Sequence, residues 1–235
     1  MCRHAAWLGA PRTLASLIGE PEHGLLTQSY APRMQRHGRV NADGFGMGWY
    51  DQARAAPVRY RRAVPMWADA NLAALAEVAR SGCLLAAVRS ATVGMPIEET
   101  ATAPFTDGRH LLSLNGRAAP DAVRALAADA ESPCDAAWLA AGVFTLLRAG
   151  TPLPAALAET VARTAAKDPA ARLNLLACDG ATVAATTWGD TLYLREDPGG
   201  VLLASEPLDD HPAWRPVPDR HLVLATGDGV RAEPL

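Results

Sequence analysis

Short apolar runs and alternating apolar and polar positions predict β-strands mainly toward the two ends of the chain. The predicted strands cover residues 2–8, 43–50, 58–64, 83–88, 110–114, 171–177, 182–188, 192–194, 201–205 and 221–225. Asp179-Gly180 lies between two of these strands and is typical of a two-residue hairpin. The glycines within 43–50 indicate a strand that another backbone approaches closely.

Apolar residues at helical spacing occur mainly in the middle of the chain. They predict helices over 69–80, 120–130, 135–147 and 154–166, and Thr13 is expected to cap a short helix that ends near residue 18. Residues 21–42 hold Gly, Pro, His, Asn and Arg without a period, so we expect a long functional loop there. Strands, then helices, then strands again predict an α+β fold with separate layers. No repeat or break in composition marks a second domain, so residues 1–235 are expected to form one domain.

Composition and charge exclude several classes of function. The 235 residues carry 22 basic and 25 acidic side chains, and the net charge of −3 gives no footprint for nucleic acid. No apolar run reaches the roughly 18 residues of a membrane helix, and the first residues lack a signal-peptide pattern. We therefore expect a cytoplasmic protein that binds neither nucleic acid nor membrane.

The four cysteines are too far apart for a zinc motif, so we expect free thiols and no metal site. Cys83, Cys134 and Cys178 fit small buried side chains. Cys2 differs because it follows the initiator methionine, and removal of Met1 leaves a thiol and a free α-amine on one residue. An α-amine has an ordinary pKa of about 7.7–8.0, so it can accept the thiol proton near neutral pH. The alternative is that a cysteine occupies this position by chance.

Three further segments each have a structural and a chemical interpretation. Asn115-Gly116 follows an apolar run and fits either a type I′ turn or an oxyanion hole formed by the Asn amide and the Gly N–H. Arg89 fits either a surface ion pair or a bidentate contact with a substrate carboxylate. Asp135 fits either a helix N-cap or a ligand for a substrate ammonium. Together with Cys2, these groups suggest a site that binds both ends of an amino acid and attacks an acyl group beyond them.

Four motifs in order carry a resemblance to a known family: Met1-Cys2-Arg3-His4, the segment NADGFGMGWY at 41–50, Arg89-Ser90-Ala91-Thr92 and Asn115-Gly116. In this order and spacing the chain resembles the class II glutamine amidotransferases. These are N-terminal nucleophile hydrolases that fold as four-layered αββα sandwiches, and the resemblance spans most of the chain. MCRH, NADGFGMGWY and the segment ASEPLDD at 204–210 are most similar to the γ-glutamyl hydrolases of ergothioneine biosynthesis.

The resemblance implies a catalytic role for three residues. Cys2 is expected to attack the γ-glutamyl carbonyl, and its own α-amine is expected to carry the thiol proton to the leaving group. Asn115 and Gly116 are expected to form the oxyanion hole. The implied reaction passes through a γ-glutamyl thioester and requires no metal or organic cofactor.

The resemblance also implies how the glutamyl group is bound. Arg89 and Thr92 are expected to bind its α-carboxylate, and Asp135 its α-ammonium. The family often has Ser/Thr-Asp-Ser/Thr-Glu around this aspartate, whereas this chain has Cys and Ala on either side of Asp135. Asp129 is therefore the second candidate for this role.

The implied substrate is γ-glutamyl hercynylcysteine S-oxide, whose leaving group carries a trimethylammonium that aromatic faces can hold. The aromatic candidates are Trp7, Trp49, Tyr50, Trp67, Trp138, Trp188 and Trp214. Arg33, Arg36 and Arg39 either meet the carboxylates of the substrate or belong to a solvated loop. His4 and His37 either line the site or have packing and surface roles.

Two other functions stay open on the sequence alone. One is a glutaminase subunit that supplies ammonia to a separate synthase, and the other is a non-catalytic scaffold on the same fold. An assay of glutamine against bulky γ-glutamyl amides, with and without a partner protein, separates the two enzymes. A scaffold predicts that Cys2→Ala leaves biological activity intact. The sequence also leaves open whether the chain forms a homo-oligomer.

Overall fold

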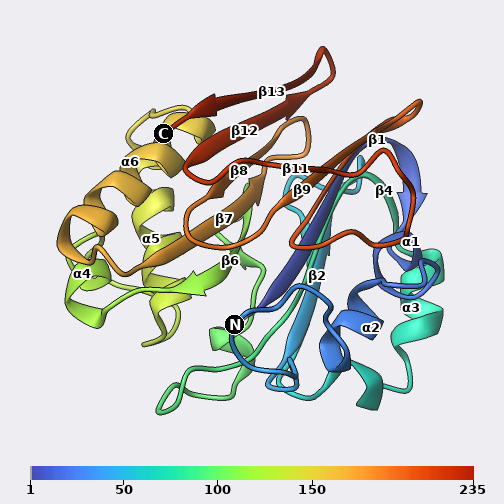
Figure 1. The fold of residues 1–235 in the computed structure, drawn as a ribbon, viewed down its shortest axis with the longest axis horizontal. Helices are drawn as coiled ribbons and strands as arrows, with labels where there is room; N and C mark the ends of the chain where they lie inside the picture. Colours follow the sequence, from blue (N-terminus) through green and yellow to red (C-terminus); the bar gives the residue numbers. More distant parts are fainter. Residues whose placement is uncertain (1) are drawn as a thin grey trace.

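Two antiparallel sheets pack against each other in the computed structural model, which describes residues 2–235 (Figure 1). The first sheet contains seven strands: β1 (Arg3–Thr13), β2 (Phe45–Trp49), β3 (Val58–Arg62), β4 (Arg80–Val88), β9 (Tyr193–Asp197), β10 (Gly200–Ala204) and β11 (Arg215–Pro216). The second sheet contains six strands: β5 (Phe105–Thr106), β6 (Leu111–Arg117), β7 (Arg172–Cys178), β8 (Val183–Thr187), β12 (His221–Thr226) and β13 (Gly229–Pro234).

β1 lies at the centre of the first sheet, whose strand order is β11-β9-β10-β1-β4-β2-β3. Its side chains alternate between two apolar layers: Ala6 and Leu8 face the second sheet, whereas Ala5 and Trp7 face the helices on the other side. A strand that is buried on both faces has a continuous apolar sequence, which explains why this strand was predictable. The second sheet has the order β13-β12-β8-β7-β6-β5.

Helices cover the outer face of each sheet (Figure 1). On the first sheet lie α1 (Ala15–Ile18), α2 (Leu25–Tyr30) and α3 (Leu72–Val78), and on the second α4 (Pro120–Arg124), α5 (Asp135–Arg148) and α6 (Leu153–Lys167). The expected α+β class and αββα layer order are confirmed. No helix within residues 2–235 is both long enough and apolar enough to cross a membrane.

Several boundaries differ from the sequence prediction. Thr13 does not cap α1: it is the last residue of β1, paired with Arg80, and the N-cap of α1 is Leu14 without a side-chain hydrogen bond. α2 lies inside the segment expected as loop, and its buried face includes Gln28 and Ser29, so its apolar pattern is weak. The helix expected over 120–130 already ends at residue 124. β13 was not predicted because most of its side chains are exposed.

The predicted hairpin between β7 and β8 is confirmed, but its loop is longer than expected. Cys178 and Val183 form the last strand pair, so residues 179–182 make a four-residue connection. Gly180 has a φ of 96°, which a glycine adopts readily. The Asp179 carboxylate accepts the Thr182 amide at 2.8 Å and closes the turn.

All four cysteines are free thiols, as expected. Cys83, Cys134 and Cys178 are buried in the core, whereas Cys2 is only half-buried. The thiol at the start of the chain is thus in a different environment from the other three.

Candidate active site

Cys2 and Arg89 meet at one end of the first sheet, where β1 begins and β4 ends. Arg3 pairs with Val88, so Cys2 and Arg89 are the next residues outward across these antiparallel strands. Both line a small cavity of about 20 Å³, and Ser113 of β6 lines its opposite side. This volume holds about one water molecule, so a glutamyl group requires neighbouring side chains to move as it enters. Met1, whose removal the thiol chemistry requires, lies outside the described residues.

The segment before β2 holds Arg89 in place. The Arg89 amide donates to the Gly44 carbonyl at 2.8 Å, and its carbonyl accepts the Asp43 amide at 2.9 Å. Its Nη1 donates to the Asp43 carbonyl at 3.4 Å. The residue is only 8% exposed, and no carboxylate in residues 2–235 forms an ion pair with it. The surface ion-pair interpretation is therefore wrong, and the guanidinium charge is available to a ligand.

Asp135 connects the start of α5 to the end of β6. It is the first helical residue and not the N-cap, which is Cys134, so the capping interpretation is wrong. Its carboxylate accepts the Ala118 amide at 3.0 Å and the Ala136 amide at 2.9 Å. Burial raises the pKa of Asp135, and these amides and the charge of Arg89 oppose that effect. Asp135 and Arg89 are thus close enough for the charge of the arginine to lower the pKa of the aspartate.

Asn115 and Gly116 lie inside β6, opposite Asn174 and Leu173 of β7, so the type I′ turn interpretation is wrong. A Cβ on Gly116 would collide with the carbonyl oxygen of Arg172, which explains why glycine is needed there. The side chain of Asn115 is fully buried, and neither its Oδ1 nor its Nδ2 has a hydrogen-bond partner in the described part of the chain. A buried amide without a partner costs free energy unless a ligand satisfies it.

The alternation of side chains along the strands directs Asn115 toward Cys2. His4 of β1 contacts Ser113 of β6, with 3.2 Å between Nδ1 and Oγ. Cys2 lies two residues before His4, and Asn115 lies two residues after Ser113. Because side chains alternate along extended backbone, Cys2 is on the same face as His4 and Asn115 is on the same face as Ser113. Leu111, two residues back on β6, packs in the core between the sheets together with Ala6 and Leu8 of β1, as this facing arrangement requires.

Asn174 shows how a buried asparagine in this sheet is normally satisfied. Its Nδ2 donates to the carbonyls of Asp190 and Thr191, each at 3.1 Å. Its Oδ1 accepts the Trp188 amide at 2.9 Å. Asn174 therefore fixes the connection between β8 and β9, whereas its neighbour Asn115 has no such structural role.

His4 lies beside the site as a neutral side chain. Burial, and to a lesser degree the charge of Arg3, lower the pKa of His4 to about 3. At neutral pH the imidazole therefore carries no charge beside the Cys2 thiol. His37, the other candidate histidine, is exposed in the loop that follows α2.

The remaining predicted site residues are not brought to Cys2 in the same way. Thr92 is half-buried in the turn after Arg89, where its carbonyl accepts the Met95 amide. Asp129 is exposed and lines a separate cavity, so the geometry favours Asp135 over it. None of the seven aromatic candidates lines the cavity at Cys2, as far as residues 2–235 define it.

Sequence reasoning missed a buried ion-pair cluster behind the nucleophile. Arg3 is fully buried, with Nη2 3.7 Å from Asp190 and Nη1 3.8 Å from Glu206. Burial lowers the pKa of Arg3, and the two carboxylates oppose that effect. Arg3 and Glu206 belong to the two short motifs, MCRH and ASEPLDD, that carry part of the family resemblance. Charged residues within such motifs were the available signal.

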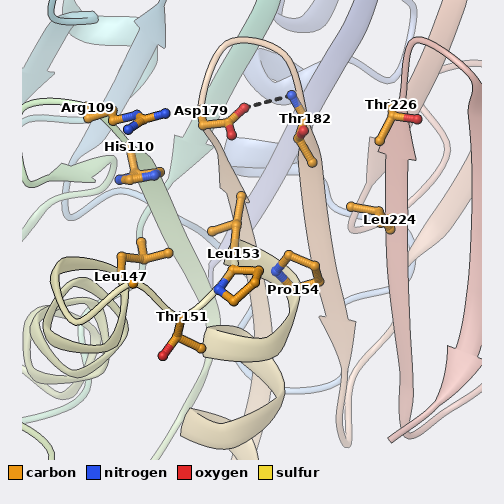
Figure 2. A pocket seen from close by; sticks show the side chains of 12 residues that line it. Arg109, His110, Leu147, Thr151, Leu153, Pro154, Asp179, Thr182, Leu224 and Thr226 are labelled. Carbon is orange, nitrogen blue, oxygen red and sulfur yellow. Dashed lines mark hydrogen bonds between the residues drawn. The ribbon is translucent and has the colours of Figure 1, made fainter.

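A larger cavity, of about 470 Å³, lies at the far end of the second sheet (Figure 2). His110 and Arg109 precede β6, Leu153 and Pro154 begin α6, and the Asp179 loop closes one side. His110 is held by the Asp107 carboxylate at 3.0 Å. Because strands rise about 3.3 Å per residue, Asn115 lies roughly 16 Å farther along β6. This cavity is therefore separate from the site at Cys2.

One group of side chains in residues 2–235 has metal-like spacing: Glu22, His23 and Asp210. Two of the three are exposed, and Asp210 already pairs with the guanidinium of Arg33 at 2.7 Å. The arrangement is that of a surface ion-pair network, and it includes none of the residues around Cys2.

Comparison with known proteins identifies the family of this site. No protein-family model matches the chain. The gamma-glutamyl-hercynylcysteine sulfoxide hydrolase of Mycolicibacterium smegmatis is 52% identical over 235 residues, covering 100% of both chains. The enzyme of that name from Mycobacterium tuberculosis is 52% identical over 98% of this chain and 95% of its own. A solved glutamine aminotransferase class-II domain protein from Silicibacter pomeroyi superposes with a TM-score of 0.71 at 25% identity, covering 100% of this chain and 99% of its own. The protein therefore belongs to the gamma-glutamyl-hercynylcysteine sulfoxide hydrolase family, on the fold of the class II glutamine amidotransferases.

Proposed function

We propose that the protein hydrolyses the γ-glutamyl amide of gamma-glutamyl-hercynylcysteine sulfoxide to glutamate and hercynylcysteine sulfoxide, in the cytoplasm. The observation that carries the proposal is the shared cavity of Cys2 and Arg89, faced by the strand that holds the unpartnered amide of Asn115. Relatives named for this reaction are 52% identical over nearly the whole chain. Four free thiols are in keeping with a reducing compartment.

The nucleophile is Cys2 after removal of Met1. Its α-amine takes the thiol proton, and the sulfur attacks the γ-carbonyl carbon to form a C–S bond and a tetrahedral oxyanion. The C–N bond then breaks, and the ammonium returns the proton to the departing amine. Water attacks the resulting thioester with the α-amine again as base, which releases glutamate and restores the thiol.

The oxyanion of each tetrahedral intermediate is bound by Asn115 and Gly116. The Asn115 Nδ2 has no partner in the described chain, so it can donate without breaking a bond in the protein. A donor that is already in position stabilises developing charge without reorganisation at the moment of reaction. The Gly116 N–H supplies the second donor.

The glutamyl group is anchored through its α-carbon. Arg89 binds the α-carboxylate with its guanidinium, which forms no ion pair within residues 2–235, and Thr92 in the following turn adds a contact to the same group. Asp135 binds the α-ammonium, and this interaction stabilises the ionised form of a carboxyl whose pKa burial otherwise raises. An amino acid with both charges is thus recognised before its side-chain carbonyl reaches the thiol.

The test is release of glutamate from gamma-glutamyl-hercynylcysteine sulfoxide, with glutamine as the comparison substrate and Cys2→Ala as the control. Turnover of the large amide well above that of glutamine, lost in Cys2→Ala, supports the proposal. Intact mass measurement should show a chain that begins at Cys2. Preference for glutamine, rising when a partner protein is added, would instead identify an ammonia-supplying subunit.

A further inference from the structure

The segment 31–42 crosses the end of the first sheet at which Cys2 lies. Four residues lie side by side at this end of the sheet: Glu206 after β10, Cys2 before β1, Arg89 after β4 and Asp43 before β2. The backbone amides of residues 33 and 34 attach the segment to Glu206 by hydrogen bonds. The segment then leads into Asp43, whose amide donates to the Arg89 carbonyl. Because β1 and β4 lie between β10 and β2, the segment must pass over the start of β1.

Glu206 is the attachment point of this segment. It is fully buried, and its two carboxylate oxygens accept the amides of Arg33 at 2.9 Å and Met34 at 2.8 Å. The register of β1 with β10 places Glu206 directly opposite Arg3, whose Nη1 is 3.8 Å away. Two backbone N–H groups and one buried cation thus bind the same carboxylate. A fully buried glutamate is rare, and its charge strengthens the hydrogen bonds that hold the loop.

Arg3 connects this anchor to a second loop. Its guanidinium also approaches Asp190 at 3.7 Å and donates to Thr191 at 3.5 Å. These two residues, with Tyr193 and Asp219, line a cavity of about 290 Å³, to which the segment 31–42 contributes Arg36. The cavity therefore lies beside the residue that follows Cys2, and its walls carry both positive and negative groups.

We propose that Glu206 is a positioning residue that holds the segment 31–42 as the wall of the leaving-group side, and that it thereby sets the preference for large γ-glutamyl amides over glutamine. The proposal rests on the proposed function. Ammonia, the leaving group of glutamine, is too small to touch such a wall. Hercynylcysteine sulfoxide carries carboxylates and a trimethylammonium, which match the exposed Arg36 on one side of the cavity and the exposed Asp219 on the other.

Two substitutions separate anchoring from folding. Glu206→Gln keeps the side-chain size but turns one acceptor oxygen into an NH₂ group that faces a backbone N–H. Glu206→Asp keeps the charge for Arg3 but shortens the reach to the segment. Asp210→Asn is the matched control, because it removes the exposed 2.7 Å contact of the Arg33 side chain and leaves both backbone bonds intact.

The main measurement is the ratio of kcat/KM for gamma-glutamyl-hercynylcysteine sulfoxide to kcat/KM for glutamine. In Glu206→Gln the ratio is expected to fall at least about tenfold, through KM for the large amide, and in Asp210→Asn to stay within about twofold. Using the ratio cancels any loss that both substrates share through Cys2. An unchanged ratio in folded Glu206→Gln or Glu206→Asp overturns the proposal.

A second measurement does not depend on activity. Arg33, Arg36 and Arg39 make the segment a substrate for trypsin, and cleavage of the native protein is expected to be faster in both Glu206 variants than in wild type or Asp210→Asn. In the wild-type protein the Arg33 and Met34 amides should exchange with solvent more slowly than those of Arg36 and Arg39. Equal exchange at all four amides overturns the anchor even if no variant folds. If the wild-type protein prefers glutamine, the proposed function is overturned. The trypsin and amide-exchange results then still decide whether Glu206 anchors the segment.

Discussion

Asn115 and Asn174 lie opposite each other on neighbouring strands, are both fully buried, and offer a matched pair of substitutions. Asn115→Ala removes an amide with no partner in the described chain, and Asn174→Ala removes one with three hydrogen bonds. If the first is reserved for the oxyanion, its loss should lower kcat by about 10²–10³-fold. Its loss should change the free energy of unfolding by less than about 1 kcal/mol, since no hydrogen bond is broken.

Asn174→Ala should show the opposite pattern. Three hydrogen bonds at about 0.5–1.5 kcal/mol each correspond to a loss of about 1.5–4.5 kcal/mol in the free energy of unfolding. The assay for both variants is glutamate release at saturating substrate beside urea denaturation, with the free energy taken from the linear extrapolation. If Asn115→Ala is destabilised like Asn174→Ala and keeps most of its kcat, the assignment of Asn115 to the oxyanion is refuted.

Three further predictions concern the surroundings of the site. Gly116→Ala should lower the free energy of unfolding by about 1–3 kcal/mol in urea denaturation, because its Cβ collides with the Arg172 carbonyl; an unchanged value contradicts the close approach of β6 and β7. Arg89→Lys should lower kcat/KM about 10–100-fold, since an ammonium cannot make the paired contact, and a change below threefold argues against carboxylate binding. His4 has its pKa lowered from about 6.5 unfolded to about 3 folded, so its contribution to stability is complete above pH 6.5 and declines as the pH falls toward 3. Between pH 7 and 4.5 wild type should lose about 2.5 kcal/mol more than His4→Gln, and equal losses in urea denaturation contradict this.

β1 and β4, which lead into the site, were predictable because each contains an apolar run that is buried on both faces. These runs cover residues 5–8 and 83–88, and no polar residue interrupts the second run before Arg89. The helices α5 and α6 are long enough for their apolar spacing to be clear. The class of fold and the location of the thiol therefore followed from local sequence.

The conformation of Asn115-Gly116 was not determined locally. Asn-Gly is a favoured turn pair, but pairing with β7 keeps these residues in an extended strand, and the glycine is needed for close packing. Asp135 was predicted as the N-cap of α5 but lies one residue after it, for a similar reason: its carboxylate accepts a hydrogen bond from the Ala118 amide at the end of β6. In both cases a tertiary contact overrode a local preference.

The ion-pair cluster of Arg3 and Glu206 could not be derived from spacing. The two residues lie near opposite ends of the sequence and become partners only through the register of β1 with β10. Charged residues next to apolar runs are usually solvated, and nothing in their immediate sequence distinguishes a buried one. Such pairs need either a fold or a family resemblance to be found.

The distribution of the thiols has a practical consequence. Cys83, Cys134 and Cys178 are enclosed by the core, and Cys2 alone among the described cysteines has solvent contact. A mild alkylating reagent applied to the folded protein should therefore attach to a single sulfur. The mass added per chain then counts the molecules whose Cys2 thiol is intact, and the mass of each labelled chain shows whether it begins at Cys2, without any need for substrate.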